Sequence, residues 1–154
     1  MKLSMKTDYA LRALLGLVEH YGQGAVSIRE LAKRYDIPQR FLGQIMMELK
    51  ERGIVSSVSG RDGGYVLARP PADITIGQIV RNFDGILAPI HCVSVTRYEA
   101  CSQEAVCRFR RVLLGIRNHT ARLMDSMTLA ALACGEPVTE EEVFSEELQW
   151  GAGI

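Results

Sequence analysis

The chain has 154 residues, of which 47% are hydrophobic, and its formal net charge at pH 7 is zero. This length fits one compact domain with an appended element, and the hydrophobic fraction is sufficient for a buried core. No apolar run reaches the roughly 18 residues of a membrane span, and the first residues lack the pattern of a signal peptide. We therefore expect a cytoplasmic protein with no membrane partner, in a compartment that keeps its four cysteines reduced.

The charge is divided unevenly along the chain. Residues 1–69 contain eleven Lys and Arg against seven Asp and Glu, a net charge of +4, whereas residues 70–154 contain seven against eleven, a net charge of −4. A basic first half joined to an acidic second half is typical of a DNA-binding module followed by a module that does not bind DNA. A chance distribution would also produce a difference of this size.

The first half has the pattern of three helices. Thr7 and Asp8 predict the start of the first helix, whose apolar residues recur at helical spacing. Ser27, with Glu30 three residues later, predicts the cap of a short second helix. Pro38 fits the first turn of a third helix that ends at residue 53. The predicted buried residues of this third helix are Phe41, Leu42, Ile45, Met46 and Leu49.

Two short strands follow, at residues 54–58 and 65–67, and the run SGRDGG between them supplies the glycines of a hairpin turn. A further helix begins near Ile74 and ends near Phe83. Helices, a tight turn and a hairpin in this order predict a winged helix-turn-helix DNA-binding domain over residues 1–84. The alternative is a small helical domain with an incidental hairpin.

The third helix and the hairpin carry the predicted DNA contacts. Arg and Gln pair with the edges of guanine and adenine, and an arginine at the wing tip can enter the minor groove or hold phosphate. A solvated polar face would have a similar composition. The predicted DNA-binding residues are Ser27, Gln39, Arg40, Gln44, Lys50, Arg52 and Arg61.

Residues 85–107 form a predicted loop that contains Cys92, Cys101 and Cys107, in the spacing C-x8-C-x5-C. Thiolates hold iron–sulfur clusters or zinc, but structural zinc sites usually pair their ligands two to four residues apart. The loop is therefore a candidate cluster-binding segment. Free thiols that act as a disulfide switch are an alternative, because nearby arginines favour the reactive thiolate. Inert thiols are the third possibility, and Cys134 is predicted to be a small buried hydrophobic residue.

Residues 108–135 form a predicted dimerisation helix, because apolar residues recur there at alternating spacings of three and four. The predicted seam consists of Val112, Ile116, Leu123 and Met127. Helix-turn-helix proteins commonly read two half-sites as dimers, so we expect a homodimer on a palindromic operator of double-stranded DNA. The alternative is that this helix packs on its own domain. Residues 136–154 are predicted to be a poorly ordered acidic C-terminal tail.

Four segments and the three loop cysteines together resemble the Rrf2 family of bacterial winged-helix transcriptional regulators. The segments are KLSMKTDYALRALLGL, IPQRFLGQIMMELKERGIVSSVSGRDGGYVLAR, ITIGQIV and LMDSMTLAAL, and the resemblance covers about residues 1–133. It implies a mainly α fold with a small β-hairpin wing and a long C-terminal dimerisation helix. In many members it also implies a [2Fe–2S] or [4Fe–4S] cluster on the three cysteines, which senses cluster status, iron, nitric oxide or redox state.

The chain departs from the IscR type of this family at three positions. Arg110 stands where that type has a fourth ligand, a histidine; Gly43 replaces a glutamate of the recognition helix; and Ser59 replaces a wing arginine, with Arg61 two residues further on. The fourth ligand must then come from elsewhere. Asp8 matches an aspartate that ligates the cluster from the partner subunit in an NsrR-type member.

Two alternatives to a fourth ligand at Asp8 remain open. The carboxylate of Asp8 could serve only to stabilise the start of its helix. His91 lies next to Cys92, and imidazole replaces thiolate in some clusters.

We therefore predict a homodimeric, sequence-specific DNA-binding transcriptional regulator that senses iron–sulfur cluster, iron, redox or nitric oxide status through its three-cysteine site. The alternative is a regulator of the same fold without a cluster, which uses a thiol switch or a small-molecule effector. The three histidines are scattered, and the sequence contains neither a nucleophile elbow nor a phosphate-binding loop before a helix. We therefore do not expect an enzyme.

Overall fold

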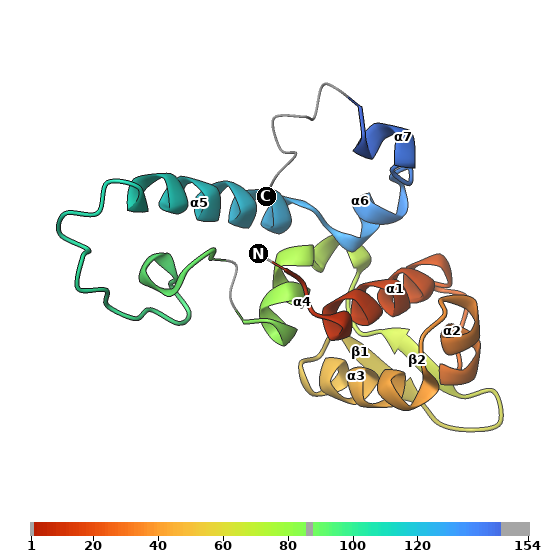
Figure 1. The fold of residues 1–154 in the computed structure, drawn as a ribbon. Helices are drawn as coiled ribbons and strands as arrows, with labels where there is room; N and C mark the ends of the chain where they lie inside the picture. Colours follow the sequence, from red (N-terminus) through yellow and green to blue (C-terminus); the bar gives the residue numbers. More distant parts are fainter. Residues whose placement is uncertain (1, 86–87, 146–154) are drawn as a thin grey trace.

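The computed structural model describes residues 2–85 and 88–145 of the chain (Figure 1). Within them the fold is mainly helical with a two-stranded antiparallel sheet, which confirms the predicted fold class. The elements are α1 Met5–Glu19, α2 Ile28–Arg34, α3 Gln39–Glu51, β1 Val55–Val58, β2 Gly64–Leu67, the 3-10 turn η1 Pro71–Asp73, α4 Ile76–Phe83, the 3-10 turn η2 His91–Val93, α5 Arg110–Ser126, α6 Leu129–Ala133 and α7 Glu140–Val143.

The first helix starts earlier than Thr7 and Asp8 predict. Ser4 is the cap, and its side chain accepts a hydrogen bond from the backbone N–H of Thr7. Thr7 is fully buried instead, and its hydroxyl donates to the carboxylate of Asp84 at 2.9 Å. Because Asp84 is the C-terminal cap of α4, this bond joins the start of α1 to the end of α4. Asp8 lies in the first turn, as predicted for an acidic residue near a helix N-terminus.

Helix α3 buries Leu42, Ile45, Met46 and Leu49, as predicted. Phe41 is the exception, because 58% of its surface is exposed. Successive residues of a helix are rotated by about 100°, so the side chain next to Leu42 falls to one side of the stripe that faces the core. The predicted burial of Phe41 is therefore wrong.

The hairpin is the predicted wing. Its register pairs Val55 with Leu67 and Val58 with Gly64. Val26 and Tyr65 exchange two backbone hydrogen bonds of 2.9 and 3.0 Å, which fix the hairpin to the segment before α2. Gly64 is required at this crossing, because a Cβ atom there would collide with the backbone carbonyl of Val26.

The chain returns to the winged domain after α5. The predicted helix over residues 108–135 is broken at Met127 and Thr128, whose backbones are extended, and Thr128 caps the separate helix α6. Here Leu129 donates its N–H to the carbonyl of Ile74 at 2.8 Å. Its side chain is 0% exposed and belongs to the core formed by α1, α3 and the hairpin. Figure 1 shows α6 above α1, while α5 and the cysteine loop extend away from the winged domain.

Two expectations for the C-terminal residues need correction. Cys134 is exposed, because it ends the short helix α6 on the solvent side. Part of the predicted poorly ordered tail forms α7, where Thr139 and Glu142 form a reciprocal capping box. Residues 146–154 of that tail lie outside the described residues.

Candidate functional site

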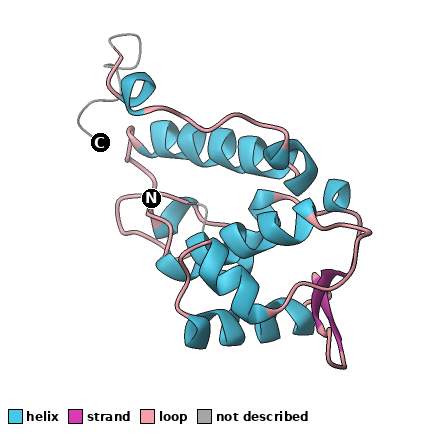
Figure 2. Ribbon diagram, turned by 90° about the vertical axis from the view of Figure 1, so that its right-hand side faces the viewer, coloured by secondary structure: helices cyan, strands magenta, loops and turns pink. Residues whose placement is uncertain are grey.

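The predicted DNA-binding residues fall into two groups. Gln39, Arg40 and Gln44 are exposed on the first turns of α3, and Arg61 is exposed in the turn between β1 and β2. Within the described part of the chain, these four side chains form no hydrogen bond or ion pair. Figure 2 shows the hairpin projecting beyond the helices at one end of the molecule. This group therefore has the freedom and the exposure that contacts to a DNA groove require.

The other three predicted residues have partners inside the protein. The amine of Lys50 donates to the hydroxyl of Ser57 on β1 at 2.7 Å. Arg52 donates to the side chain of Asn82 on α4 at 3.3 Å. Ser27 caps α2 with its hydroxyl, which accepts from the N–H of Glu30. These side chains therefore have a structural role, because they hold α3, the wing and α2 in place. A role in DNA binding would come in addition to this structural role.

Two apolar side chains on α3, Phe41 and Met47, are also exposed on this helix. Apolar groups can contact the methyl group of thymine in the major groove. Neither was predicted as a DNA contact: periodicity assigns Phe41 to the buried stripe, and Met47 carries no polar group that would indicate such a role.

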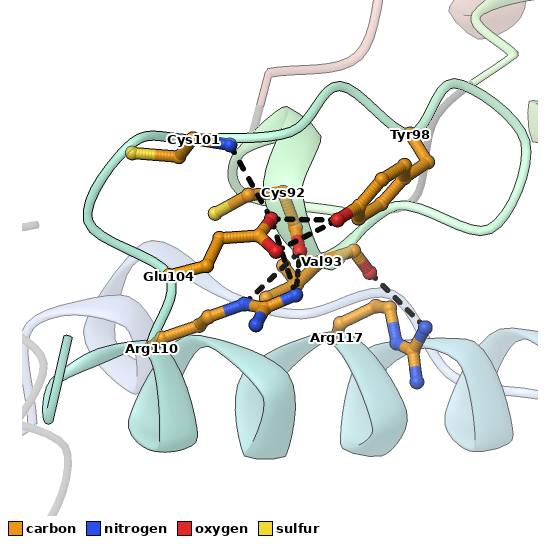
Figure 3. Close-up of polar contacts among 7 residues, drawn as sticks. All are labelled: Cys92, Val93, Tyr98, Cys101, Glu104, Arg110 and Arg117. Carbon is orange, nitrogen blue, oxygen red and sulfur yellow. Dashed lines mark hydrogen bonds and ion pairs between the residues drawn. The ribbon is translucent and has the colours of Figure 1, made fainter. Parts of the chain in front are cut away.

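The cysteine loop is fastened to α5 by two arginines (Figure 3). Arg110 donates to the carbonyl oxygen of Cys92 through Nε at 3.2 Å and Nη2 at 2.8 Å. About two turns further along α5, Arg117 donates to the carbonyl of Val93 at 3.0 Å. The turn η2 is thereby held against α5, and Cys92 is 8% exposed. Arg110 cannot ligate a metal, but it positions a cysteine that can.

The Glu104 carboxylate is the centre of the hydrogen bonds within the loop (Figure 3). It accepts from the hydroxyl of Tyr98 at 2.7 and 2.9 Å and from the N–H of Cys101 at 3.4 Å. It also forms an ion pair with Arg110 at 3.3 Å. The hydrogen bond from Tyr98 lowers the pKa of Glu104, with further contributions from Cys101 and Arg110, and raises that of Tyr98. The sequence signal for this residue was its place three residues from each cysteine, in C-x2-E-x2-C.

A cavity of about 460 Å³ lies between the loop and α5. Cys92, Cys107, Tyr98 and Glu104 line it on the loop side, whereas Cys101 is exposed on the same loop. The α5 side and its approach are basic, with Arg108, Arg110, Arg111 and Arg117. Thiolate and carboxylate donors in a positively charged cavity suit an anionic iron–sulfur cluster in their chemistry.

The donor atoms are not assembled as a finished metal site. Over residues 2–85 and 88–145, no three His, Cys, Asp or Glu side chains are arranged to hold a metal ion. Cys101 would have to turn inward, which the loop between residues 94 and 109 allows because it contains no regular helix or strand. All four cysteines are free thiols.

The two side chains considered as fourth ligands lie outside this cavity. Asp8 is paired with Arg12 on the same face of α1 at 2.7 Å. His91 is exposed, and its Nδ1 lies 3.7 Å from the carboxylate of Glu99. Neither side chain contacts the loop cysteines within this chain.

Helix α5 contains no buried residue, although its sequence is strongly amphipathic. Val112, Ile116 and Leu123 are exposed together with Phe109. Met127, the fourth residue of the predicted seam, follows the helix at its C-terminal cap and is half-buried. An exposed apolar stripe of this kind usually marks a surface that another chain covers.

None of the helices described is long and apolar enough to cross a membrane.

Three known proteins that are similar to this chain are each named as regulators. The chain is 39% identical over 145 residues to an rrf2-like HTH-type transcriptional regulator of Rhodobacter capsulatus, over 90% of this chain and 97% of that protein. It is 35% identical over 132 residues to the HTH-type transcriptional regulator NsrR of Geobacillus kaustophilus, over 86% of this chain and 89% of that protein. The solved structure of CymR, the global cysteine regulator of Bacillus subtilis, has a TM-score of 0.76 at 31% identity and covers 86% of this chain and 96% of that one.

A family model described as Rrf2, iron-dependent transcriptional regulator, matches residues 3–135. This range contains the winged domain, the cysteine loop, α5 and α6. The relatives are named as transcriptional regulators and not as enzymes. The chain therefore belongs to the Rrf2 family of DNA-binding transcriptional regulators.

Proposed function

We propose that this protein is a homodimeric cytoplasmic regulator that reads a palindromic operator with α3 and the wing and senses iron, redox or nitric oxide status through an iron–sulfur cluster. The cluster would be held by Cys92, Cys101 and Cys107, with a fourth ligand for which Asp8 of the partner subunit is the candidate by family resemblance. Thiolates on iron supply a centre that can be oxidised, can react with nitric oxide, or can be lost when iron is scarce.

The observation that carries this proposal is the position of the cysteine loop. Cys92 and Cys107 line a basic cavity whose other wall is α5. The same helix exposes the apolar stripe of Ile116 and Leu123, which we assign to the dimer interface. A change at the cysteines would therefore act directly on the element that sets the separation of the two α3 helices, and DNA affinity would follow from the difference in stability between the two arrangements.

The proposal divides the chain by role. Residues 1–84 form the DNA-binding domain, residues 85–107 the cluster-binding loop and residues 108–135 the dimerisation segment, followed by the acidic tail at 136–154. Within the dimerisation segment α6 also contributes Leu129 to the core of the DNA-binding domain.

The cofactor is tested by anaerobic reconstitution with ferrous iron and sulfide. The parent should bind iron and sulfide in near-stoichiometric amounts and develop visible absorption, whereas the protein with serine at Cys92, Cys101 and Cys107 should not. Cys134→Ser is the matched control, because Cys134 lies on α6, outside the cavity. Equal iron in the triple-serine protein and the parent would exclude the cluster site.

DNA reading is tested by binding to operator fragments whose half-site centres lie about 34 Å apart, one helical turn, or a multiple of it. Arg40→Ala should relax base preference and cost about 1–3 kcal/mol if Arg40 pairs with guanine. Arg61→Ala should weaken binding more evenly across sequences and flatten the dependence on salt. Arg122→Ala, at an exposed position of α5 outside the cavity, is the control that should leave operator binding unchanged. Intact binding by both Arg40→Ala and Arg61→Ala at moderate salt would show that this face does not read DNA.

A second candidate function is a regulator without a cluster that senses through its thiols. Four free cysteines and the similarity to CymR, named as a cysteine regulator, favour it. Reversible loss of DNA binding on oxidation, in metal-free parent but not in the triple-serine protein, would support this function.

A further inference from the structure

Glu104 lies on the cysteine loop and shares a cavity with two of its cysteines. It lies in the loop between Cys101 and Cys107 and lines the cavity that Cys92 and Cys107 line. Figure 3 shows its carboxylate on the side of the loop where the Cys92 sulfur lies. Of the described residues that line this cavity, Glu104 is the one with a carboxylate.

The partners of Glu104 hold it in this position without covering it on all sides. Tyr98 and the N–H of Cys101 donate hydrogen bonds to the carboxylate, and Arg110 forms an ion pair with it, yet the Glu104 side chain remains 21% exposed. Each carboxylate oxygen can accept about two interactions, so the group retains capacity for a further bond. Because one of its donors is the backbone of Cys101, movement of Glu104 and movement of that cysteine are linked.

The other candidates are less well placed. Asp8 lies on α1, does not line the cavity, and would have to come from a second subunit. His91 does not line the cavity, and its ring faces Glu99.

We propose that Glu104 is the fourth protein ligand of the cluster, so that four side chains of one loop in one subunit hold it. This inference rests on the proposed function. In the loaded protein, the Glu104 carboxylate would hold iron in place of its hydrogen bond from Tyr98, and Cys101 would have to turn inward. Arg110 keeps its two hydrogen bonds to the Cys92 carbonyl, and the basic residues around the cavity balance the charge of the added thiolates.

The test compares four variants of the full-length protein after anaerobic reconstitution with ferrous iron and sulfide. Glu104→Gln keeps the size of the side chain and an oxygen that accepts from Tyr98, but an amide is a poor iron ligand. Tyr98→Phe removes the hydrogen bond and keeps the carboxylate. Glu99→Gln removes an exposed carboxylate of the same loop, and Asp8→Asn removes the rival ligand. The readouts are visible absorption and circular dichroism, and the rate of iron loss to a chelator; far-ultraviolet circular dichroism verifies the fold of each variant.

We expect Glu104→Gln to change the visible spectrum and to lose iron at least about tenfold faster than the parent, since even a supporting residue of a metal site changes affinity by that factor. Tyr98→Phe, Glu99→Gln and Asp8→Asn should keep the parent spectrum. If Glu104→Gln keeps the parent spectrum and rate, or if Tyr98→Phe reproduces its effect, Glu104 is not a ligand. A changed spectrum in Asp8→Asn alone would assign the fourth position to Asp8 instead.

Failure of the proposed function would appear separately. In that case the triple-serine protein would hold as much iron as the parent, or the parent would bind none, whatever residue stands at position 104.

Discussion

Arg110 holds the cysteine loop closed, and its removal should open the loop by a measurable amount. Replacing Arg110 with Ala deletes both hydrogen bonds to the Cys92 carbonyl and the ion pair with Glu104. A hydrogen bond that involves a charged group contributes about 1.5–3 kcal/mol. Because the Arg110 side chain is 31% exposed, water replaces part of this interaction. We therefore assign the lower limit of this range to the two hydrogen bonds and the ion pair together.

A loss of about 1.4 kcal/mol corresponds to a tenfold rise in the population of the open loop. Cys92 is nearly buried and becomes accessible only when the loop opens, so its alkylation rate should rise about tenfold. Site-resolved mass spectrometry after timed treatment of the reduced, metal-free protein with iodoacetamide measures this rate. Cys134 is exposed at the end of α6, outside the loop, and provides an internal reference whose rate should stay the same.

Arg111→Ala is the matched control, because Arg111 is exposed on the next position of the same helix and its side chain forms no hydrogen bond or ion pair among the residues described. An unchanged Cys92 rate in folded Arg110→Ala protein would refute the reasoning. An equal acceleration at all four cysteines would show instead that the variant unfolds as a whole.

Three further measurements test other parts of the structure. Replacing Ile116 and Leu123 with Lys places charge in the proposed dimer seam, so light scattering should show a monomer; a folded dimer would exclude α5 as the main interface. Leu129→Ala should lower the free energy of unfolding in urea by about 2–5 kcal/mol, because Leu129 is fully buried, and a change well below about 1 kcal/mol would mean that α6 does not belong to the core. The pKa of Tyr98 is raised and that of Glu104 is lowered by their hydrogen bond, so this contact should be lost as pH rises through the raised value or falls through the lowered one. Ultraviolet titration should therefore show one tyrosine ionising at lower pH in Glu104→Ala, which removes the acceptor, than in the parent, and identical titrations would contradict the contact.

The order of the elements and the site of the cysteine loop could be predicted from local patterns. Thr75 caps α4 and the hairpin lies where its glycines indicated, because caps and turns depend on residues close in sequence. The first cap shows the limit of this reasoning. Ser4 and Thr7 are both suitable cap residues, and the choice between them depends on Asp84, which lies 77 residues from Thr7.

Burial was harder to predict, because it depends on which neighbours cover a side chain. Cys134 has the chemistry of a buried residue, but it stands at the C-terminal cap of α6, where its side chain is exposed. Leu129 was not assigned to the core, although the backbone pairing of Thr128 with Thr75 carries it there.

The hydrogen bonds that hold the cysteine loop could not be predicted from local patterns either, because they depend on residues that only the fold brings together. The sequence marked Arg110 only as a position without a histidine, whereas in the fold it reaches back 18 residues to the Cys92 carbonyl. Glu104 had a regular spacing between two cysteines, but its role as the shared acceptor of the loop depends on Tyr98 and Arg110 together.

Helix α5 is attached to the winged domain at one end and to the cysteine loop at the other. Its C-terminal end is fixed to the winged domain, by the Arg81–Asp125 ion pair at 2.5 Å and by the pairing of Thr128 with Thr75. Its other end, at Arg110, touches the cysteine loop. With 17 residues at 1.5 Å per residue the helix is about 25 Å long, so each degree of rotation at the fixed end displaces the Arg110 end by about 0.4 Å. Conversely, a displacement of the loop end of α5 corresponds to a small change of angle at its fixed end. In the proposed dimer, two winged domains paired through α5 would change their relative orientation in small steps, without a change in the core of either domain.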